Sequence, residues 1–277
     1  MKTIGFIGAG SMAEAMINGL LKSGMMKPDH ILVTNRSNDA RLKELKDTYG
    51  VLPCRDKTAF FEKTDIIVLA IKPKDAAKSI AGIRSHIKNQ LVISVLAGIT
   101  IETIQCYFER NLTVIRAMPN TSAAIGKSAT AFSASPEAGA DAIKTAKTLL
   151  ETIGEASLVE EKHMDAVTAI AGSGPAYLYH YAEAMETAAH KVGLEEGFAK
   201  RLILQTMAGA IEMLQQSGKQ PAQLRTEITS AGGTTESGLR ALKERCFEDA
   251  IVHCIEETAK RSGEIKEEFA GTVLKHM

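Results

Sequence analysis

The chain has 277 residues, of which 45% are apolar and 24% charged, a balance typical of a folded globular protein rather than a disordered one. Lysine and arginine total 33, as do aspartate and glutamate, so no overall field attracts nucleic acid or an anionic membrane. Tryptophan is absent and aromatic residues reach only 5%, which argues against sites that stack bases or sugars.

Short runs rich in isoleucine and valine alternate with helical patterns in the first half of the chain. The strand candidates are Thr3–Gly8, Ile31–Asn35, Ile66–Ile71, Leu91–Val95 and Val114–Arg116. The helical candidates are Met12–Lys22, Asp39–Tyr49, Lys74–His86 and Ile101–Glu109. Because the strand runs are apolar on both faces, they predict an α/β fold with a doubly wound parallel sheet covered by helices.

Two further strand-like runs, Ser128–Ser133 and Ala156–Val159, flank a helical pattern near Ala138–Glu151 and extend the predicted sheet. After about residue 160 the pattern becomes helical, with segments at His163–Ile170, Ala176–Val192, Glu195–Gln216 and Glu236–Arg261. Gly193, Gly218 and Gly263 are predicted helix stops. We therefore expect a dinucleotide-binding domain over 1–160 and a helical substrate-binding and dimerisation domain over 161–277.

The apolar helices of the second half lack an obvious polar face, as in Ala182–Ala189. Such helices need a partner that covers them, and a second copy of the chain is the expected partner.

The sequence Gly8-Ala9-Gly10-Ser11-Met12-Ala13 reads G-x-G-x-x-A between the first strand and the first helix. In the Rossmann arrangement the first glycine allows a tight turn and the second allows backbone to approach a pyrophosphate. The alanine then keeps the helix close to the sheet. The alternative is a plain tight connection, but the position between strand and helix favours a dinucleotide site.

Cofactor choice is predicted from the end of the second strand, where an acidic residue would bind the ribose of NAD. This chain has Asn35, Arg36 and Ser37 there, with no acid before Asp39. A guanidinium with two neighbouring donors suits a 2′-phosphate, so NADPH is the expected cofactor and NADH the weaker alternative. A solvated turn arginine is the alternative interpretation of Arg36.

The cysteines and histidines show no metal or redox pattern. Cys54, Cys106, Cys246 and Cys254 form no CxxC pair, and free thiols fit a reducing cytoplasm. The histidines lack HxH, HxxxH and HExxH spacing, so we expect no metal site. The sequence has no apolar run long enough to span a membrane, and its apolar start is too short for a signal peptide. We therefore expect a cytoplasmic protein.

Two glycine-rich breaks interrupt the helical half. Residues 171–177 read Ala-Gly-Ser-Gly-Pro-Ala-Tyr, which also fits simple helix capping. Residues 228–239 contain Gly232 and Gly233 followed by Thr234 and Thr235 at a helix start. Backbone N–H groups with adjacent hydroxyls at such a turn can bind a carboxylate without a lysine or arginine, although a capped loop is the alternative.

Over essentially its full length the sequence resembles the pyrroline-5-carboxylate reductase family. The matching segments are residues 5–13, 69–73 (Leu-Ala-Ile-Lys-Pro), 116–121 (Arg-Ala-Met-Pro-Asn-Thr), 165–177 and 229–235. The last two together are specific, whereas the first alone is not. One departure is Ala231, where the family usually has proline, and it puts substrate affinity rather than reaction class in doubt.

The resemblance implies NADPH-dependent reduction of a cyclic imine, 1-pyrroline-5-carboxylate, to L-proline. Together with the motif, it implies cofactor contacts at Ile7, Gly8, Ala9, Gly10, Ser11, Met12, Asn35, Arg36, Ser37, Lys57, Ile71, Lys72, Pro73, Ala97, Met118 and Asn120. The implied substrate contacts are Glu161, Ser230, Gly232, Gly233, Thr234 and Thr235, with Thr235 as the catalytic hydroxyl. It also implies a homodimer formed through the helical domain. In the family, five such dimers sometimes assemble into a decamer.

Two other functions compete with this one. A β-hydroxyacid dehydrogenase or imine-reductase-like oxidoreductase shares the first domain, but the catalytic lysine of β-hydroxyacid dehydrogenases would fall on Leu178, which cannot act as a base. A non-catalytic nucleotide-binding paralogue is the other, and Ala231 is the only feature that favours it.

Overall fold

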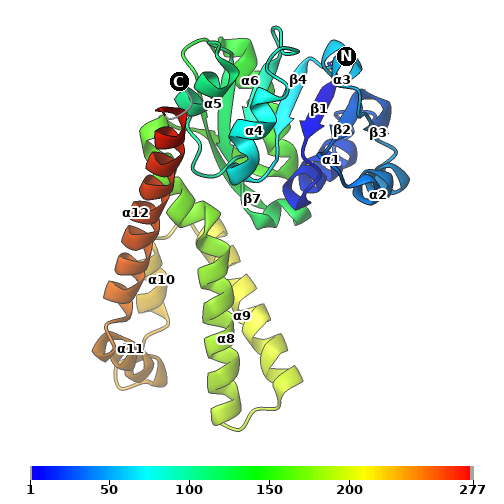
Figure 1. Cartoon of the computed structure of the whole chain (residues 1–277). Coiled ribbons are helices and arrows are strands. Elements are labelled where there is room, and N and C mark those ends of the chain that lie inside the picture. The colour runs from blue at the N-terminus through cyan, green and yellow to red at the C-terminus, as the bar shows by residue number, and fades with distance from the viewer. Residues whose placement is uncertain (1, 275–277) are drawn as a thin grey trace. The chain divides into compact units, whose positions relative to one another are not determined.

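The computed structural model describes the backbone of residues 2–274 and the side chains of residues 2–271. Contacts divide the chain into two compact units. Figure 1 shows the elements, coloured from blue to red by residue number. The first unit contains Met1–Ser173 with Glu257–Met277, and the second contains Gly174–Glu256. The domain boundary at residue 160 stays a prediction about sequence organisation.

The first unit is built on an eight-stranded sheet with the order β3-β2-β1-β4-β5-β6-β7-β8. The strands are β1 (Ile4–Ile7), β2 (Ile31–Thr34), β3 (Leu52–Pro53), β4 (Ile66–Leu69), β5 (Leu91–Ser94), β6 (Val114–Met118), β7 (Ser128–Ala134) and β8 (Gly154–Leu158). The predicted doubly wound sheet is confirmed. It differs in one respect, because β6 and β7 pair antiparallel, with Ala117 opposite Phe132.

Helices cover both faces of this sheet. They are α1 (Ser11–Lys22), α2 (Asp39–Tyr49), α3 (Lys57–Lys63), α4 (Ala76–Ala81), α5 (Ile101–Phe108), α6 (Ala140–Leu150) and α7 (Met164–Val167). Short 3₁₀ turns lie at Pro28–His30, Pro73–Asp75, Thr121–Ile125, Glu151–Ile153 and Glu161–His163, and a π-helical turn at Thr168–Gly172 follows α7.

Alternate residues of the strands enter two separate cores. Phe6 and Val33 pack with α1, α2 and α6 on one face, in a cluster that includes Met16, Leu45 and Leu149. Ile67 and Leu69 pack on the other face with α3, α4 and α5, together with residues such as Phe60, Ile80 and Ile104. The strands are therefore buried on both faces, as their continuous apolar sequence predicts.

Local signals explain where the predictions agree and where they fail. Helix α2 has the predicted bounds because the Asn38 side chain caps it and Gly50 ends it in the left-handed conformation (φ 72°). The two-residue strand β3 and the helix α3 were not predicted, since neither is long enough to show a periodicity. The predicted helix Lys74–His86 is a 3₁₀ turn followed by the shorter α4.

The second unit is helical, as predicted, with α8 (Gly174–Lys191), α9 (Glu196–Gln216), α10 (Pro221–Glu227), α11 (Thr234–Glu244) and the first part of α12 (Phe247–Leu274). The single helix expected over Glu236–Arg261 is wrong: α11 and α12 are separate, and Cys246 between them has φ 54°. Gly263 does not end a helix, because α12 continues through it.

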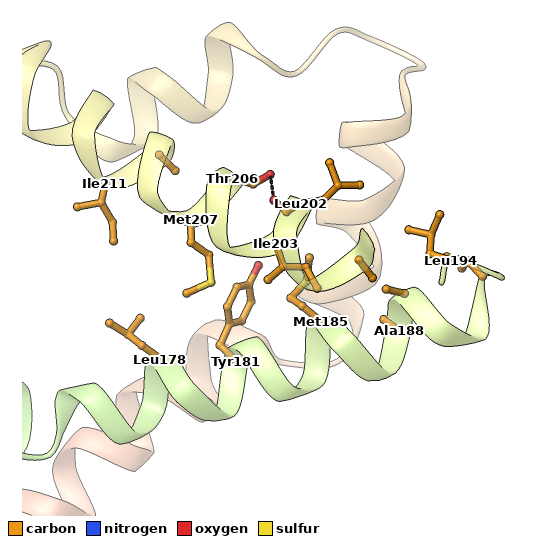
Figure 2. A pocket seen from close by; sticks show the side chains of 14 residues that line it. Leu178, Tyr181, Met185, Ala188, Leu194, Leu202, Ile203, Thr206, Met207 and Ile211 are labelled. Atoms are coloured by element: carbon orange, nitrogen blue, oxygen red, sulfur yellow. Dashed lines mark hydrogen bonds between the residues drawn. The ribbon is translucent and has the colours of Figure 1, made fainter. Parts of the chain in front are cut away.

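The second unit has a small buried core within one chain. Ala189, Ala199 and Ile203 are its buried cluster, with Met207 packed against them. Side chains of α8 and α9 border an apolar hollow of about 550 Å³, in which Leu178, Tyr181 and Met185 face the side chains of α9 (Figure 2). Leu202 and Ile211 on α9 are 45% and 47% exposed. Within the described residues, helices long and apolar enough to cross a membrane are absent.

Candidate active site

A crevice lies at the carboxyl ends of β1, β2 and β4. In the sheet β1 lies between β2 and β4, so the strands that follow β1 in the chain are added first on one side of it and then on the other. Ile7, Thr34 and Leu69 are paired in register across these strands, so the residues that follow them meet at one edge. Ligands of doubly wound folds bind at this position. The cavity there has a volume of about 380 Å³ and is lined by Ile7, Gly8, Thr34, Asn35, Arg36, Cys54, Arg55, Lys57, Phe60, Phe61, Ile71, Asp75, Lys78, Ser79, Gly82 and Ile83.

The glycine-rich turn contains Gly8 and Gly10, and each position is glycine for a different physical reason. Gly8 has φ 113°, and a Cβ built there would lie 2.2 Å from the Ala70 carbonyl oxygen, so the fold itself requires glycine. A Cβ at Gly10 would meet nothing within 4 Å among the described residues. The fold therefore leaves the backbone of Gly10 bare for another reason, and close approach by a pyrophosphate is the reason that the motif predicts.

Helix α1 begins at Ser11, directly after this turn. Among the described side chains none caps it, so the first-turn N–H groups at Ser11 and Met12 are available to an anion. Ala9 and Ala13 are buried against the core. These residues fit the pyrophosphate of a dinucleotide.

The loop after β2 is closed by its own asparagines. The Asn35 side-chain amide donates to the Asn38 carbonyl at 2.8 Å, and the Asn38 N–H donates back to Asn35 Oδ1 at 2.9 Å. Asn35 therefore shapes the loop, while Arg36 and Ser37 are exposed. The Arg36 side chain is 77% exposed, and the nearest recorded charge to its guanidinium is the Asp75 carboxylate at 3.8 Å.

Ten of the residues that line this cavity were missed by the sequence interpretation, and Arg55, Asp75 and Lys78 are the charged ones among them. Arg55 Nη1 donates to the Asn35 carbonyl, and its guanidinium pairs with Asp39, so it joins the segment before α3 to the loop after β2. The sequence gives no signal for Arg55, because β3 and α3, which place it, were not predicted. Lys57, at the start of α3, lines the cavity and donates to the Gly82 carbonyl at 2.8 Å.

Of the residues that follow β4, only some line the cavity. Ile71 lines the cavity, whereas Lys72 and Pro73 are absent from its described lining and lead into the 3₁₀ turn Pro73–Asp75. Ala97 lies at a different hollow of about 360 Å³, beside Gly98, Ser173 and residues of α12. The structure therefore groups Ala97 with the Ser173 segment rather than with Arg36 and Lys57.

Met118 and Asn120 both contact the glycine-rich break after α7. The Asn120 side-chain amide donates to the Ala171 carbonyl at 3.0 Å, and its Oδ1 accepts from the Ser122 N–H at 3.0 Å. A Cβ at Gly172 would lie 2.6 Å from the Met118 methyl carbon. These two residues therefore hold the backbone of this break in place.

Glu161 is engaged within the first unit. One of its oxygens accepts from Arg116 Nη1 at 3.0 Å and from the Ile101 N–H at 2.8 Å, at the start of α5. The Arg116 side chain is 4% exposed, so its charge needs this partner. In the described chain Glu161 thus binds a buried arginine and a helix start, and its substrate contact stays a prediction.

The glycine-rich turn of the second unit precedes α11. Gly232 has φ 70°, and its N–H donates to the Glu236 carboxylate at 2.7 Å, while the Gly233 N–H donates to the Ser230 carbonyl at 3.0 Å. The turn does bind a carboxylate, but it is that of Glu236. Thr234 and Thr235 begin α11, where no side chain of the described chain forms a cap.

The sheet, the bare glycine turn and the crevice at the strand-order reversal define a class of protein, the dinucleotide-binding oxidoreductases. Comparisons with known proteins narrow the class. Residues 161–265 match the family described as pyrroline-5-carboxylate reductase dimerisation, and residues 3–98 match the family of coenzyme F420-dependent NADP oxidoreductases.

Full-length relatives carry the same name. The chain is 73% identical over 274 residues to pyrroline-5-carboxylate reductase 2 of Bacillus subtilis, covering 99% of each chain. It is 35% identical to the enzyme of Corynebacterium melassecola, covering 96% and 99%. The chain belongs to the pyrroline-5-carboxylate reductase family.

Solved structures agree with this assignment. The Coxiella burnetii pyrroline-5-carboxylate reductase superposes with a TM-score of 0.88 at 31% identity, covering 95% of this chain and 98% of that one. The NADP-bound pyrroline carboxylate reductase of Plasmodium falciparum gives 0.87 at 26% identity, covering 96% and 98%.

Proposed function

We infer that the chain reduces 1-pyrroline-5-carboxylate to L-proline, with NADPH as the preferred cofactor and NADH as a weaker one. The observation that carries this function is the 73% identity, over 99% of both chains, to a pyrroline-5-carboxylate reductase. A bound NADP in the Plasmodium falciparum relative supports the choice of a nicotinamide dinucleotide.

The first unit has residues that fit such a cofactor. The bare backbone at Gly10 and the uncapped start of α1 suit a pyrophosphate, and Arg36 beside the crevice suits a 2′-phosphate. Lys57 lines the same crevice and adds a second cation. When bound, the nicotinamide supplies a hydride, which is the difficult chemical step. We propose the remaining predicted cofactor residues as contacts from the family resemblance, and of these Lys72, Pro73 and Ala97 lie outside the described lining of the crevice.

The proposed substrate contacts of the second unit are Ser230, Gly232, Gly233, Thr234 and Thr235, and Glu161 of the first unit is proposed separately, from the family resemblance alone. N–H groups of Gly232, Gly233 and Thr234 would bind the substrate carboxylate, which requires Glu236 to release the Gly232 N–H and the Ser230 carbonyl to release the Gly233 N–H. The substrate is a cyclic imine, and its protonated form accepts hydride without strong acid catalysis. The Thr235 hydroxyl would bond the ring nitrogen, orient the ring and help to deliver its proton.

We also propose that two chains form a homodimer through the second unit, with assembly of five such dimers into a decamer as a further step, and that the protein acts in the cytoplasm. The match of residues 161–265 to a dimerisation family and the exposed apolar side chains of α8 and α9 support the dimer. Free cysteines support the reducing compartment.

The test is an assay of the purified protein with pyrroline-5-carboxylate and NADPH, in which NADPH loss and proline formation are both measured. We expect one proline for each NADPH consumed, and a lower kcat/KM with NADH. A parallel assay offers β-hydroxy acids with NADP⁺. Turnover of these acids alone would assign the protein to the dehydrogenase class, and NADPH binding without any turnover would make it a binding protein.

A further inference from the structure

A cluster of charged side chains joins α2 to the glycine-rich turn at the start of α1. The Arg41 Nε donates to the Ala9 carbonyl at 2.9 Å, its Nη2 pairs with Glu14, and its Nη1 lies 2.9 Å from Glu44. The Tyr49 hydroxyl also donates to Glu14, at 3.1 Å. The Arg41 side chain is only 20% exposed and that of Glu14 32%, so their pair is partly buried, whereas Glu44 is 60% exposed.

Glu14 lies in an unfavourable place for a protein that binds phosphates here. It belongs to the first turn of α1, and its N–H is bonded to the Gly10 carbonyl. A carboxylate in this turn interacts with the same positive helix end as a pyrophosphate would. Two negative groups that share one helix end repel each other, and partial burial strengthens the repulsion.

Arg41 interacts with two groups of this turn that would oppose a bound anion, the Glu14 carboxylate and the Ala9 carbonyl. Its charge offsets that of Glu14, and its Nε–H donates to the Ala9 carbonyl, so that this acceptor is not left unpaired in the turn. The backbone of Arg41 is itself fixed, because its N–H donates to the Asn38 side chain at 2.9 Å. Asn38 is in turn bonded to Asn35, so the loop after β2 and the turn after β1 share one support.

We propose that Arg41 is a positioning residue for the dinucleotide: it compensates the Glu14 charge and holds the Gly8–Gly10 turn so that the start of α1 can bind the pyrophosphate. This role rests on the proposed function, because it needs a dinucleotide in the crevice. Arg41 touches the turn rather than the reacting atoms, so its effect should fall on cofactor binding and leave the chemical step unchanged.

The test measures NADPH dissociation constants by fluorescence titration for the wild type, Arg41→Met, Glu14→Gln and the double variant. Arg41→Met leaves Glu14 uncompensated and should raise the Kd roughly tenfold, the effect of one charge near a bound anion. Glu14→Gln removes one of the two carboxylates paired with Arg41 and leaves the Arg41–Glu44 pair, so it should lower the Kd because one negative charge near the bound pyrophosphate is gone. The double variant should return to within about threefold of the wild type, and added salt should reduce all these differences.

Kinetics and a matched control separate this role from a structural one. In Arg41→Met the kcat at saturating NADPH and the KM for pyrroline-5-carboxylate should stay near wild type. Arg84→Met breaks the Arg84–Glu109 pair outside the crevice and should leave the Kd unchanged.

Two results for NADPH binding by the variants would overturn the proposal. If Glu14→Gln weakens NADPH binding, or if the double variant binds as poorly as Arg41→Met, the cluster only supports the fold. Should Arg41→Met fail to fold, the direction of the Glu14→Gln effect decides alone. A wild-type protein that binds no NADPH would instead refute the proposed function.

Discussion

Arg36 is the residue on which cofactor choice depends in this account. Its guanidinium is exposed at the crevice, and Asp75 at 3.8 Å is a weak surface partner that a phosphate can replace. Asn35, which was predicted as a second donor, is engaged with Asn38 and shapes the loop instead. Discrimination by the 2′-phosphate therefore falls mainly on Arg36.

The variant Arg36→Ala should raise the KM for NADPH roughly ten- to a hundredfold, because a charge-assisted bond to phosphate is lost. The KM for NADH should change little, since NADH has no 2′-phosphate. Steady-state kinetics with both cofactors measures the difference, and Arg84→Ala serves as the control. An unchanged preference for NADPH in Arg36→Ala would show that Arg36 is a solvated turn residue.

Thr235 is the proposed proton-donating hydroxyl, at the second position of α11. Thr235→Ala should lower kcat about ten- to a hundredfold, because the ring nitrogen loses its partner while solvent can still protonate it. Thr235→Ser should keep most of the activity, and NADPH binding should be normal in both variants. Thr226→Ala is a matched control, since that hydroxyl only bonds the Ala222 carbonyl. A wild-type kcat in Thr235→Ala would leave Thr235 a helix-start residue.

At the scale of the elements, the carboxyl-terminal part of α12 belongs to the first unit and is held within it by a polar cluster. Asp165 accepts from Ser262 at 2.7 Å and from Lys266 at 2.8 Å. Burial tends to raise the pKa of Asp165, but the hydrogen bonds from Lys266 and Ser262 and the charges of Lys266 and Arg116 outweigh it and lower the pKa. Ile265 packs closely on Gly98 in the same contact.

A lowered pKa in the folded protein makes this contact sensitive to acid. The stabilisation by ionised Asp165 is complete above the ordinary pKa of 3.8 and is lost as the pH falls through the lower folded value. Lys266→Met should therefore lower the Tm at neutral pH, and the gap to wild type should close below pH 3.8. Thermal melts of both proteins across pH measure this. A gap that stays constant in acid would mean that Lys266 acts by packing.

Sequence reasoning succeeded where an element carries its own signals. Helix α2 could be bounded because Asn38 and Gly50 mark its ends, and the strands of the core could be located because both of their faces are apolar. The antiparallel pairing of β7 could not be predicted, since residue pattern does not encode strand direction. The break at Cys246 was missed because a left-handed cysteine has no sequence signature.

The candidate site was also predictable only where its residues carry their own signals in the sequence. The glycine-rich turn and Arg36 stand in sequence beside the strands that place them, so both could be located. The Arg55 and Arg41 contacts could not, because they join segments that are distant along the chain. The engagement of the Gly232 N–H by Glu236 depends on the side-chain conformation of the folded turn, which no spacing rule predicts.

At the scale of the whole molecule, the second unit exposes large apolar side chains that a second copy of the chain would cover. Its buried cluster is small, while apolar side chains along α8 and α9 border an open hollow (Figure 2). Covering such surface supplies roughly 25 cal/mol for each Å² removed from water, which favours association. A symmetric dimer buries the same patch on both copies.

The variant Ile211→Glu places a charge in this hollow and should dissociate the dimer and lower the Tm. Light scattering at micromolar concentration should give at least twice the chain mass of 29.7 kDa for the wild type and a smaller mass for the variant. Glu212→Gln is the control on the neighbouring exposed position, which bonds only Gln216 among its recorded partners. A wild-type mass of one chain would contradict the dimer.

The central claim is that a hydride passes from the nicotinamide to the imine carbon of pyrroline-5-carboxylate. The most direct measurement uses NADPH that carries deuterium at the transferable position of nicotinamide C4, with mass spectrometry of the proline formed. We expect one deuterium per proline, on the ring carbon that adjoins nitrogen and bears no carboxylate. Proline without deuterium, or no proline while NADPH remains bound, would contradict it.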